Sequence, residues 1–270
     1  MADQDDGVRF LRSFGRQLRI LREAAGLSRA ELGARLGYGE DQITSIELGR
    51  RIARPEAIDR ADEVLNTGGL LGVMKEEVEQ ARYPAFFRDA ARLEGDAVER
   101  CCYAVHVVDG LLQTEGYVRA LLRMRRPVLA EETIEQRVAA RLDRQKVLTK
   151  TPLPLFSFVL EESVLRRRLG GAAVLRDQLR QIVEVGRLRN VEVQVMPLDR
   201  EDNAGVDGEF LLITRNGGQH VGYVEAQGRS VLVNRREETA ALAARYGIIR
   251  AQALTPHESL AFIESLMGDL

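Results

Sequence analysis

Apolar residues in the first part of the chain recur at the spacing of an amphipathic helix. Four of them lie three or four positions apart: Phe10, Phe14, Leu18 and Leu21. That period is typical of an α-helix that buries one face. We therefore expect a first helix that ends near Gly26, where a glycine commonly terminates helical structure.

Short helices are expected after it, because start and stop signals follow closely. Ser28 with Glu31 three residues later is a capping box, which predicts a second helix over 28 to 36. Gly37 ends that helix. The apolar positions then predict a third helix over 40 to 48 and, after Pro55, a fourth that ends near residue 65.

Beyond residue 93 the pattern alternates between apolar runs typical of strands and helical periods. Strands are expected over 102–108, 154–160, 191–196, 209–215, 221–225 and 230–233. Helices are expected over 114–125, 131–148, 161–169, 172–187, 237–250 and 256–267. Asn216-Gly217-Gly218 supplies the positive φ angles of a hairpin turn. We predict an all-α N-terminal domain followed by an α+β domain with a mixed or antiparallel sheet.

The length of 270 residues suits about two domains. We place the first over 1–68 and the second over 94–270. The intervening 69–93 form a mostly helical connector that is interrupted at Tyr83-Pro84. No apolar run approaches the roughly 18 residues of a membrane span, and the acidic start lacks the order of a secretory signal. We therefore expect a cytoplasmic protein.

Charge is distributed unevenly, although the whole chain carries only −2. Ten arginines and five acidic residues lie between Val8 and Pro55, a local charge of +5 that leaves −7 for the rest. A basic N-terminal region in a nearly neutral protein favours an anionic partner for that region alone.

The helix spacing in this basic region fits a helix-turn-helix. Gly33 lets the next helix cross closely, Gly37 makes the sharp turn, and Ile43 and Ile46 face inward. The segment LSRAELGARLGYGEDQITSIELGRRIARP, 27 to 55, resembles the xenobiotic-response-element family of helix-turn-helix regulators, which includes the lambdoid phage repressors. The resemblance covers residues 9 to 68. It implies a lambda-repressor-like DNA-binding domain whose third helix enters the major groove.

The resemblance also assigns roles to individual residues. The expected base-facing residues are Glu40, Asp41, Gln42, Thr44 and Ser45. The expected phosphate contacts are Ser28, Arg29, Arg50, Arg51 and Arg54. Arg22 and Glu47 correspond to the family's ion pair between the first and third helices.

Two features depart from the family pattern. Gly39 stands where a serine or threonine usually caps the recognition helix. Glu40 and Asp41 bring two carboxylates toward DNA; a carboxylate can accept from cytosine N4, but phosphates repel it. The same acids also stabilise a helix N-terminus by about 0.3 to 1 kcal/mol each. Base recognition and helix stabilisation remain open as interpretations.

The second domain resembles an uncharacterised C-terminal domain that accompanies this helix-turn-helix type in antitoxin-like actinobacterial regulators. The stretches that carry it include VVDGLLQTEGYVRALL, 107 to 122, and RVAARLDRQKVL, 137 to 148. The resemblance implies a transcriptional regulator that is often encoded beside a small partner protein. No enzymatic activity comes with it.

The remaining candidate chemistry has ordinary structural interpretations. Cys101 and Cys102 are adjacent and the three histidines are scattered, so no metal-ligand spacing appears. We expect Glu161 and Glu162 to favour a helix N-terminus. Arg137, Arg141 and Arg144 share one helical face, which suits a solvated or ion-paired surface better than an anion site.

These patterns predict no enzyme, no cofactor and no metal. The partners that we expect are double-stranded DNA with an inverted-repeat operator and a second copy of the chain, because two-fold dimers of this type bind two half-sites. A small partner protein and a small-molecule ligand near the hairpin of the α+β domain are further expectations. The alternative hypothesis is an antitoxin-like interaction protein for which DNA binding is secondary.

Overall fold

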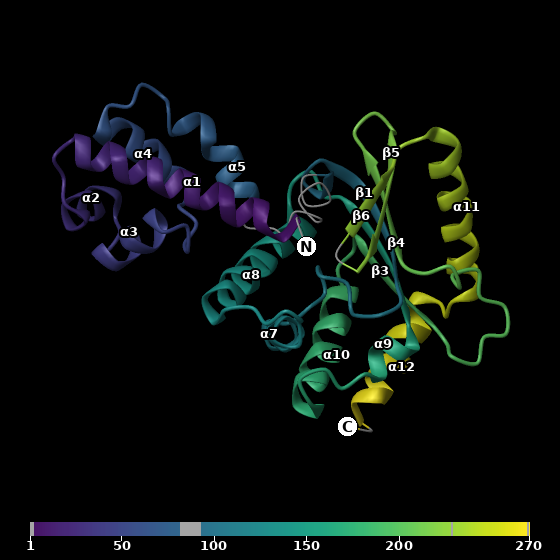
Figure 1. Cartoon of the computed structure of the whole chain (residues 1–270). Helices are drawn as coiled ribbons and strands as arrows, with labels where there is room; N and C mark the ends of the chain where they lie inside the picture. The colour runs from purple at the N-terminus through teal and green to yellow at the C-terminus, as the bar shows by residue number, and fades with distance from the viewer. Residues whose placement is uncertain (1–2, 82–92, 228, 269) are drawn as a thin grey trace. The chain divides into compact units, whose positions relative to one another are not determined.

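A computed structural model describes residues 3–81, 93–227, 229–268 and 270. The chain divides into two compact units, one of Met1–Arg88 with Ala130–Arg137 and one of Asp89–Leu129 with Val138–Leu270. Figure 1 shows the helical first unit and the second unit with its sheet. No described helix is long and apolar enough to cross a membrane.

The regular secondary structure in the described residues of the first unit is all helical. Its elements are α1 (Asp3–Ala24), α2 (Arg29–Leu36), α3 (Glu40–Glu47), α4 (Pro55–Leu65), the 3-10 helix η1 (Gly72–Met74) and α5 (Lys75–Gln80). The four predicted helices are present, with ends within a few residues of those expected. In the predicted connector, helical structure extends to Gln80, and the expected interruption at Tyr83-Pro84 lies outside the described residues.

Local signals explain where these helices begin and end. The Ser28 hydroxyl accepts from the backbone N–H of Glu31 at 3.2 Å, and the Glu31 carboxylate accepts from the Ser28 N–H at 2.7 Å. Gly37 ends α2 at φ 77°, a conformation that glycine adopts without steric cost. Pro55 occupies the first position of α4.

The core of this unit lies between α1, α2, α3 and α4. Its buried side chains include Leu11, Phe14, Leu18, Leu32, Ile43, Ile46 and Ile58. Gly33 packs so closely that a Cβ there would lie 2.5 Å from the Tyr38 carbonyl oxygen. Gly15 on α1 packs equally closely against α3, since a Cβ there would lie 2.4 Å from the Ile46 carbonyl oxygen. Close backbone contact thus fixes α3 against its neighbours.

The second unit alternates helices and strands before an antiparallel region. The strands are β1 (Ala97–Ala104), β2 (Leu155–Glu161), β3 (Val191–Met196), β4 (Phe210–Arg215), β5 (His220–Ala226) and β6 (Arg229–Val233). The helices are α7 (Glu115–Arg123), α8 (Glu131–Arg144), η2 (Gln145–Thr149), α9 (Glu162–Arg166), α10 (Ala172–Gly186), α11 (Arg236–Gln252) and α12 (Pro256–Gly268). The first turns of α8 belong to the other unit.

The six strands form one mixed sheet in the order β3-β2-β1-β4-β5-β6. β1 pairs in parallel with β2, and β2 in parallel with β3. β4, β5 and β6 add to the other side of β1 in antiparallel pairs. β1 therefore joins the parallel half of the sheet, β3-β2-β1, to the antiparallel half, β4-β5-β6. The predicted α+β class with a mixed sheet is confirmed.

Helices cover the sheet and one of its edges. α11 contacts β3, β4 and β5 (Figure 1). Its Tyr246 and Ile249 are buried in a cluster with strand residues. α10 and α12 pack against each other and against β3. At the β3 edge, Leu254 N–H donates to the Val195 oxygen at 2.9 Å, and Val195 N–H donates to Ser259 Oγ at 2.9 Å. The segment around α12 thus closes that edge.

Two predicted elements are corrected. The first strand was expected over 102–108 but occupies 97–104, because Arg100 lies inside the domain with buried acidic partners. The helix expected over 161–169 is only Glu162–Arg166. Glu161 ends strand β2 and accepts from the Tyr103 hydroxyl and from Asn203 Nδ2, so tertiary contacts occupy its carboxylate.

Candidate nucleic-acid interface

Helix α3 presents its N-terminal residues to solvent. Of the predicted base-facing residues, Glu40 and Asp41 are exposed, whereas Gln42, Thr44 and Ser45 are half-buried. Ile43 and Ile46 are buried on the opposite side. The 3.6-residue period therefore separates a packed face from a polar face that is open to a partner.

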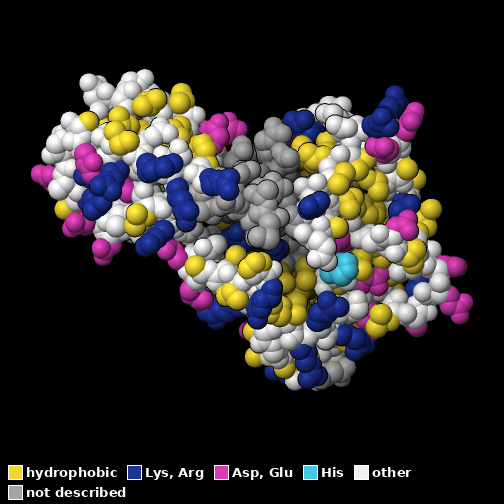
Figure 2. All heavy atoms as spheres, viewed as in Figure 1, with side chains coloured by type: hydrophobic (Ala, Val, Ile, Leu, Met, Phe, Trp, Pro, Cys, Tyr) yellow, Lys and Arg dark blue, Asp and Glu magenta, His cyan; other side chains and the backbone are white. Residues whose placement is uncertain are grey.

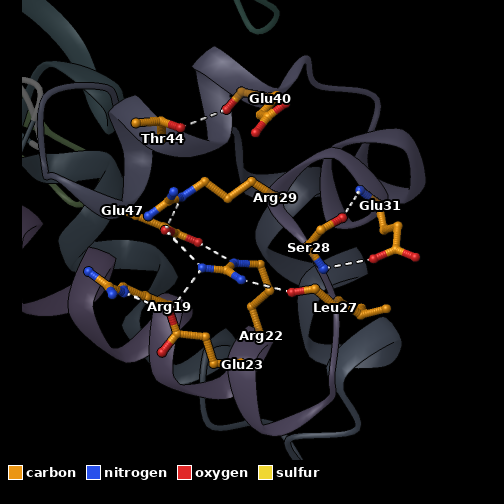
Figure 3. Close-up of polar contacts among 10 residues, drawn as sticks. All are labelled: Arg19, Arg22, Glu23, Leu27, Ser28, Arg29, Glu31, Glu40, Thr44 and Glu47. Atoms are coloured by element: carbon orange, nitrogen blue, oxygen red, sulfur yellow. Dashed lines mark hydrogen bonds and ion pairs between the residues drawn. The ribbon is translucent and has the colours of Figure 1, made fainter.

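Hydrogen bonds within α3 restrict two of these side chains. Gln42 Oε1 accepts from the Gly39 N–H at 3.0 Å, which satisfies the backbone donor of the N-cap residue itself. The Thr44 hydroxyl donates to the Glu40 carbonyl oxygen at 3.0 Å (Figure 3). Gln42 keeps its amide NH2 as a donor, and Thr44 keeps its methyl group and an acceptor oxygen.

Glu47 at the end of α3 joins three helical segments through two arginines. Arg22 Nε lies 2.5 Å from Glu47 Oε1 and Arg22 Nη2 lies 3.2 Å from Oε2, so the pair is bidentate (Figure 3). Arg22 also donates to the Leu27 carbonyl oxygen at 2.7 Å. The hydrogen bond with Glu47 raises the pKa of Arg22. This pair fixes α3 against α1.

Arg29 is the second partner of Glu47. Its Nε lies 2.8 Å from Glu47 Oε2, and 35 % of its side chain is exposed. A guanidinium has five N–H donors, so an Nε bond leaves donors directed outward. The predicted phosphate contact at Arg29 is therefore compatible with this ion pair, which holds the arginine at the surface.

The capping box of α2 engages both the hydroxyl and the backbone N–H of Ser28. The hydroxyl accepts from Glu31, so it offers a phosphate its O–H donor. The hydrogen bond from the Ser28 backbone lowers the pKa of Glu31. The backbone N–H groups at this helix start are suited to an anion.

The three other predicted phosphate contacts follow α3 in one loop that Tyr38 anchors. The Tyr38 hydroxyl accepts from the Arg54 N–H at 3.0 Å, and the Arg51 guanidinium carbon lies 6.0 Å from the Tyr38 ring centroid. Arg50 and Arg54 are exposed and Arg51 is half-buried. No role was predicted for Tyr38, because its anchoring of this loop depends on tertiary contacts.

Basic side chains gather on one face of the first unit, as the dark blue spheres of Figure 2 show. Acidic side chains lie mainly at the margin of that group in this view. Ten arginines and five acidic residues lie between Val8 and Pro55, so the exposed carboxylates of Glu40 and Asp41 belong to a segment with an excess of positive charge.

Other candidate chemistry in the described part of the chain is structural. Cys101 and Cys102 are buried in β1, and burial raises the pKa of Cys101 to about 12. Within the described ranges, no group of three or more acidic, histidine or cysteine side chains could hold a metal ion. Glu162 accepts from Arg166 at 2.5 Å and from the Leu198 N–H at 2.9 Å.

An exposed polar helix on a helical core, followed by a basic loop, is typical of a helix-turn-helix domain, and such a domain suggests a DNA-binding regulator. Residues 13–71 match the family model of a helix-turn-helix domain. Residues 87–265, more than half of the chain, match a domain of unknown function, and the chain belongs to that family, DUF5753. Neither the curated proteins nor the solved structures yield a significant match.

Proposed function

We propose that the protein is a sequence-specific transcription regulator of the xenobiotic-response-element type that acts as a dimer. In this proposal α3 enters the major groove, and Ser28, Arg29 and the loop after α3 contact phosphates. The observation that carries it is the exposed start of α3, held against α1 and α2 by Glu47 and followed by Arg50, Arg51 and Arg54. The α+β unit serves as the dimerisation and signal-receiving part and is not an enzyme.

A two-fold dimer presents two copies of α3 to successive major grooves. The operator is then an inverted repeat whose half-sites lie about 34 Å, or a multiple of that, apart. Selection of bound fragments from genomic DNA identifies the operator, and titrations at several salt concentrations measure the phosphate contacts. Absence of any selected fragment at low salt would overturn the proposal.

Single arginine variants test the phosphate contacts. Arg50→Ala should weaken binding to all sequences alike. Because each lost contact removes about one unit from the salt slope, a dimer should lose about two units. Arg180→Ala, on α10 of the other unit and paired with Asp177, is the matched control and should leave affinity and slope unchanged.

Two variants decide what the acidic residues do. If Glu40 or Asp41 accepts from cytosine N4, then Glu40→Gln or Asp41→Asn changes the selected sequence at one position. If they only stabilise the helix, the same variants strengthen binding to every sequence, because a charge repelled by phosphate is removed. Fragment selection with each variant separates these outcomes.

A second candidate is an antitoxin-like protein that sequesters a small partner protein encoded nearby. The exposed acidic tip formed by Glu40 and Asp41 favours it, since such a surface suits a basic protein partner. Copurification with the product of an adjacent gene tests it. Function that survives Arg50→Ala with Arg51→Ala would favour this candidate over DNA binding.

A small-molecule signal for the α+β unit completes the proposal. The sheet contains the β4–β5 hairpin, with Gly217 at φ 90° and Gly218 at φ 79° in its turn. A ligand near this hairpin would explain why a DNA-binding domain is joined to a larger second unit. Thermal-shift screening that yields no stabilising compound would count against it.

A further inference from the structure

The two ends of the six-stranded sheet differ in how they are covered. At the β3 end, the Leu254 N–H donates to the Val195 oxygen, and Ser259 Oγ accepts from the Val195 N–H. At the other end lies β6, and among the described residues only β5 pairs with it. Alternate residues of β6 direct their N–H and C=O groups away from β5, where that part of the chain offers no further strand.

The sequence of β6 does not protect this edge. Edge strands of native sheets commonly carry a lysine, a proline or a bulge that prevents pairing with another chain. Ser230–Val233 contains no charged residue and no proline, and the register between β5 and β6 has no shift. Val231 and Val233 are β-branched, which favours a strand. β6 is therefore a regular strand that can accept another strand beside it.

Two apolar side chains of β6 are exposed on opposite faces of the sheet. Val231 is 61 % exposed and Leu232 is 39 % exposed, and successive residues of a strand point to opposite faces. α11 covers the face of Val231 only near Val233, because a Cβ at Gly222, which pairs with Val233, would lie 2.6 Å from Leu242 Cδ1. A strand beside β6 would shield both exposed side chains from water.

A second copy of the chain fits this edge because two identical strands in antiparallel pairing are complementary to each other. With a two-fold axis at Val231, that residue faces Val231 of the second copy, and Arg229 faces Val233 of the second copy. The two arginines at position 229 then lie at opposite ends of the pair. Parallel pairing in register would place them side by side, where like charges repel.

The covered β3 end limits such an assembly to two copies. Pairing of β6 with β3 of the next copy would build an open filament, but residues 254–259 occupy that edge. Pairing of β6 with β6 uses the open edge of each copy. The result is one continuous sheet with six strands from each copy, and a covered β3 forms each of its ends.

We propose that β6 is the dimer interface of the α+β unit, where two copies pair in antiparallel orientation about a two-fold axis at Val231. Backbone hydrogen bonds set the register, and Val231 and Leu232 of both copies supply apolar contact. This inference deepens the proposed function and rests on it for the expectation of a dimer. Its test needs no DNA.

Sedimentation equilibrium of the full chain measures the dimer. The unmodified chain should be dimeric, and Val231→Lys should raise the dimer dissociation constant at least about tenfold, because two ammonium groups would face each other. Val206→Lys is the matched control, since this valine is 82 % exposed in the loop before β4, and it should stay dimeric. A monomeric unmodified chain, or an unchanged constant in Val231→Lys, would overturn the proposal.

A variant of opposite charge separates a lost interface from a lost fold. Val231→Glu should be monomeric for the same reason as Val231→Lys, and an equimolar mixture of the two should form a dimer in which glutamate faces lysine. Restored association requires that both variants are folded and that position 231 faces its own copy. If circular dichroism shows two folded variants, a mixture that remains monomeric would contradict the pairing.

Cysteine cross-linking tests the register and covers the case in which a charge at position 231 prevents folding. Opposed residues of an antiparallel pair have Cα atoms about 4.5 to 5.5 Å apart, within reach of a disulfide. Val231→Cys should form a disulfide-linked dimer under mild oxidation, since Cys101 and Cys102 are buried. Val233→Cys should not, because its two copies would lie four residues, about 13 Å, apart along the strands. Equal cross-linking of both variants, or none in Val231→Cys, would overturn the assignment.

Operator selection, carried out in parallel, distinguishes failure of this interface from failure of the proposed function. A chain that cross-links through Val231→Cys but selects no DNA would retain the interface and lose the proposed function. A Val231→Lys variant that sediments as a dimer and binds the operator would retain the proposed function and lose the interface.

Discussion

In the N-terminal unit one carboxylate, Glu47, accepts from two arginines, whereas in the C-terminal unit one arginine, Arg100, donates to two carboxylates. The first arrangement joins the ends of three helices (Figure 3), and one of its arginines, Arg29, is 35 % exposed. The second joins a strand to the segments before and after it, with side chains that are 1 to 8 % exposed. The same chemistry supports a surface in one unit and a closed interior in the other.

The depth of burial determines how much free energy of unfolding is lost when one member of each cluster is removed. Removing one member of a buried ion pair leaves a charge without compensation, which typically costs 3 to about 5 kcal/mol. Water can solvate a member that is partly exposed and reduces that cost. The comparison therefore predicts a larger effect at Arg100 than at Glu47.

Arg100→Met should destabilise the C-terminal unit by about 3 to 5 kcal/mol, because Glu94 and Asp109 lose their shared partner inside the domain. Hydrogen exchange with peptide resolution measures this in each unit. Protection should fall in peptides of 97–104 and 155–161 and persist in peptides of α1 to α4. Arg180→Met, at an exposed pair with Asp177, is the control. Equal protection in Arg100→Met and the control would contradict the comparison.

Glu47→Gln should destabilise the N-terminal unit by about 3 kcal/mol, since Arg22 stays buried without its carboxylate while water can solvate Arg29. The expected loss of exchange protection is confined to the first unit. Asp59→Asn, which removes the exposed partner of Lys75 in the same unit, should leave that protection unchanged. A larger effect at Glu47 than at Arg100 would reverse the order argued above.

Gly33→Ala tests whether close backbone packing, rather than charge, fixes α3. A Cβ at Gly33 would lie 2.5 Å from the Tyr38 oxygen, so we expect a loss of about 1 to 3 kcal/mol from overpacking. Gly39→Ala is matched to it, because nothing lies within 4 Å of a Cβ there. Urea titrations that find the two variants equally stable would show that the α2–α3 turn adapts freely.

We expect Asp109 to make the stability of the C-terminal unit depend on pH. Burial alone would raise the pKa of this carboxyl, but the charge and hydrogen bond of Arg100 outweigh it and the pKa is lowered. A folded pKa below the unfolded one contributes stability above about pH 4, which is lost as the pH falls further. Asp109→Asn should reduce the slope of the unfolding free energy against pH in this acid range by at most about 1.4 kcal/mol per pH unit. Unchanged slopes of unfolding free energy between pH 5 and 3 would argue against the pair.

Sequence reasoning predicted the helices of the first unit because their signals are local. The Ser28 and Glu31 cap, Gly37 and Pro55 each act within a few residues of the helix end that they define. The site residues on α3 came from a family resemblance in the same short segment, and their contacts with DNA remain predictions. The pairing of Arg29 with Glu47, 18 positions apart, had no local signal.

In the second unit, the sequence-based predictions were less accurate where charged side chains are buried. A strand that contains Glu99 and Arg100 does not look apolar, so the first strand was placed five residues too late. Arg141 and Arg144 were assigned to a solvated or ion-paired face. Arg144 has an ionic partner, Glu94, 50 positions away, and only folding shows that loop 105–114 covers these arginines.

Gly39→Ser is the finest test of the difference between the units, because it changes one cap on the surface and no buried group. Gly39 has φ −76° and ψ 163°, which any residue adopts, and nothing lies within 4 Å of a Cβ there. A serine hydroxyl can accept from a first-turn N–H, beside the existing bond that the backbone N–H of residue 39 donates to Gln42 Oε1, so stability should rise by a few tenths of a kcal/mol. Exchange protection should increase in α3 alone. A rise of more than about 1 kcal/mol would mean that the start of α3 frays in the native protein and that Glu47 and Gly33 do not hold the helix as firmly as their contacts imply.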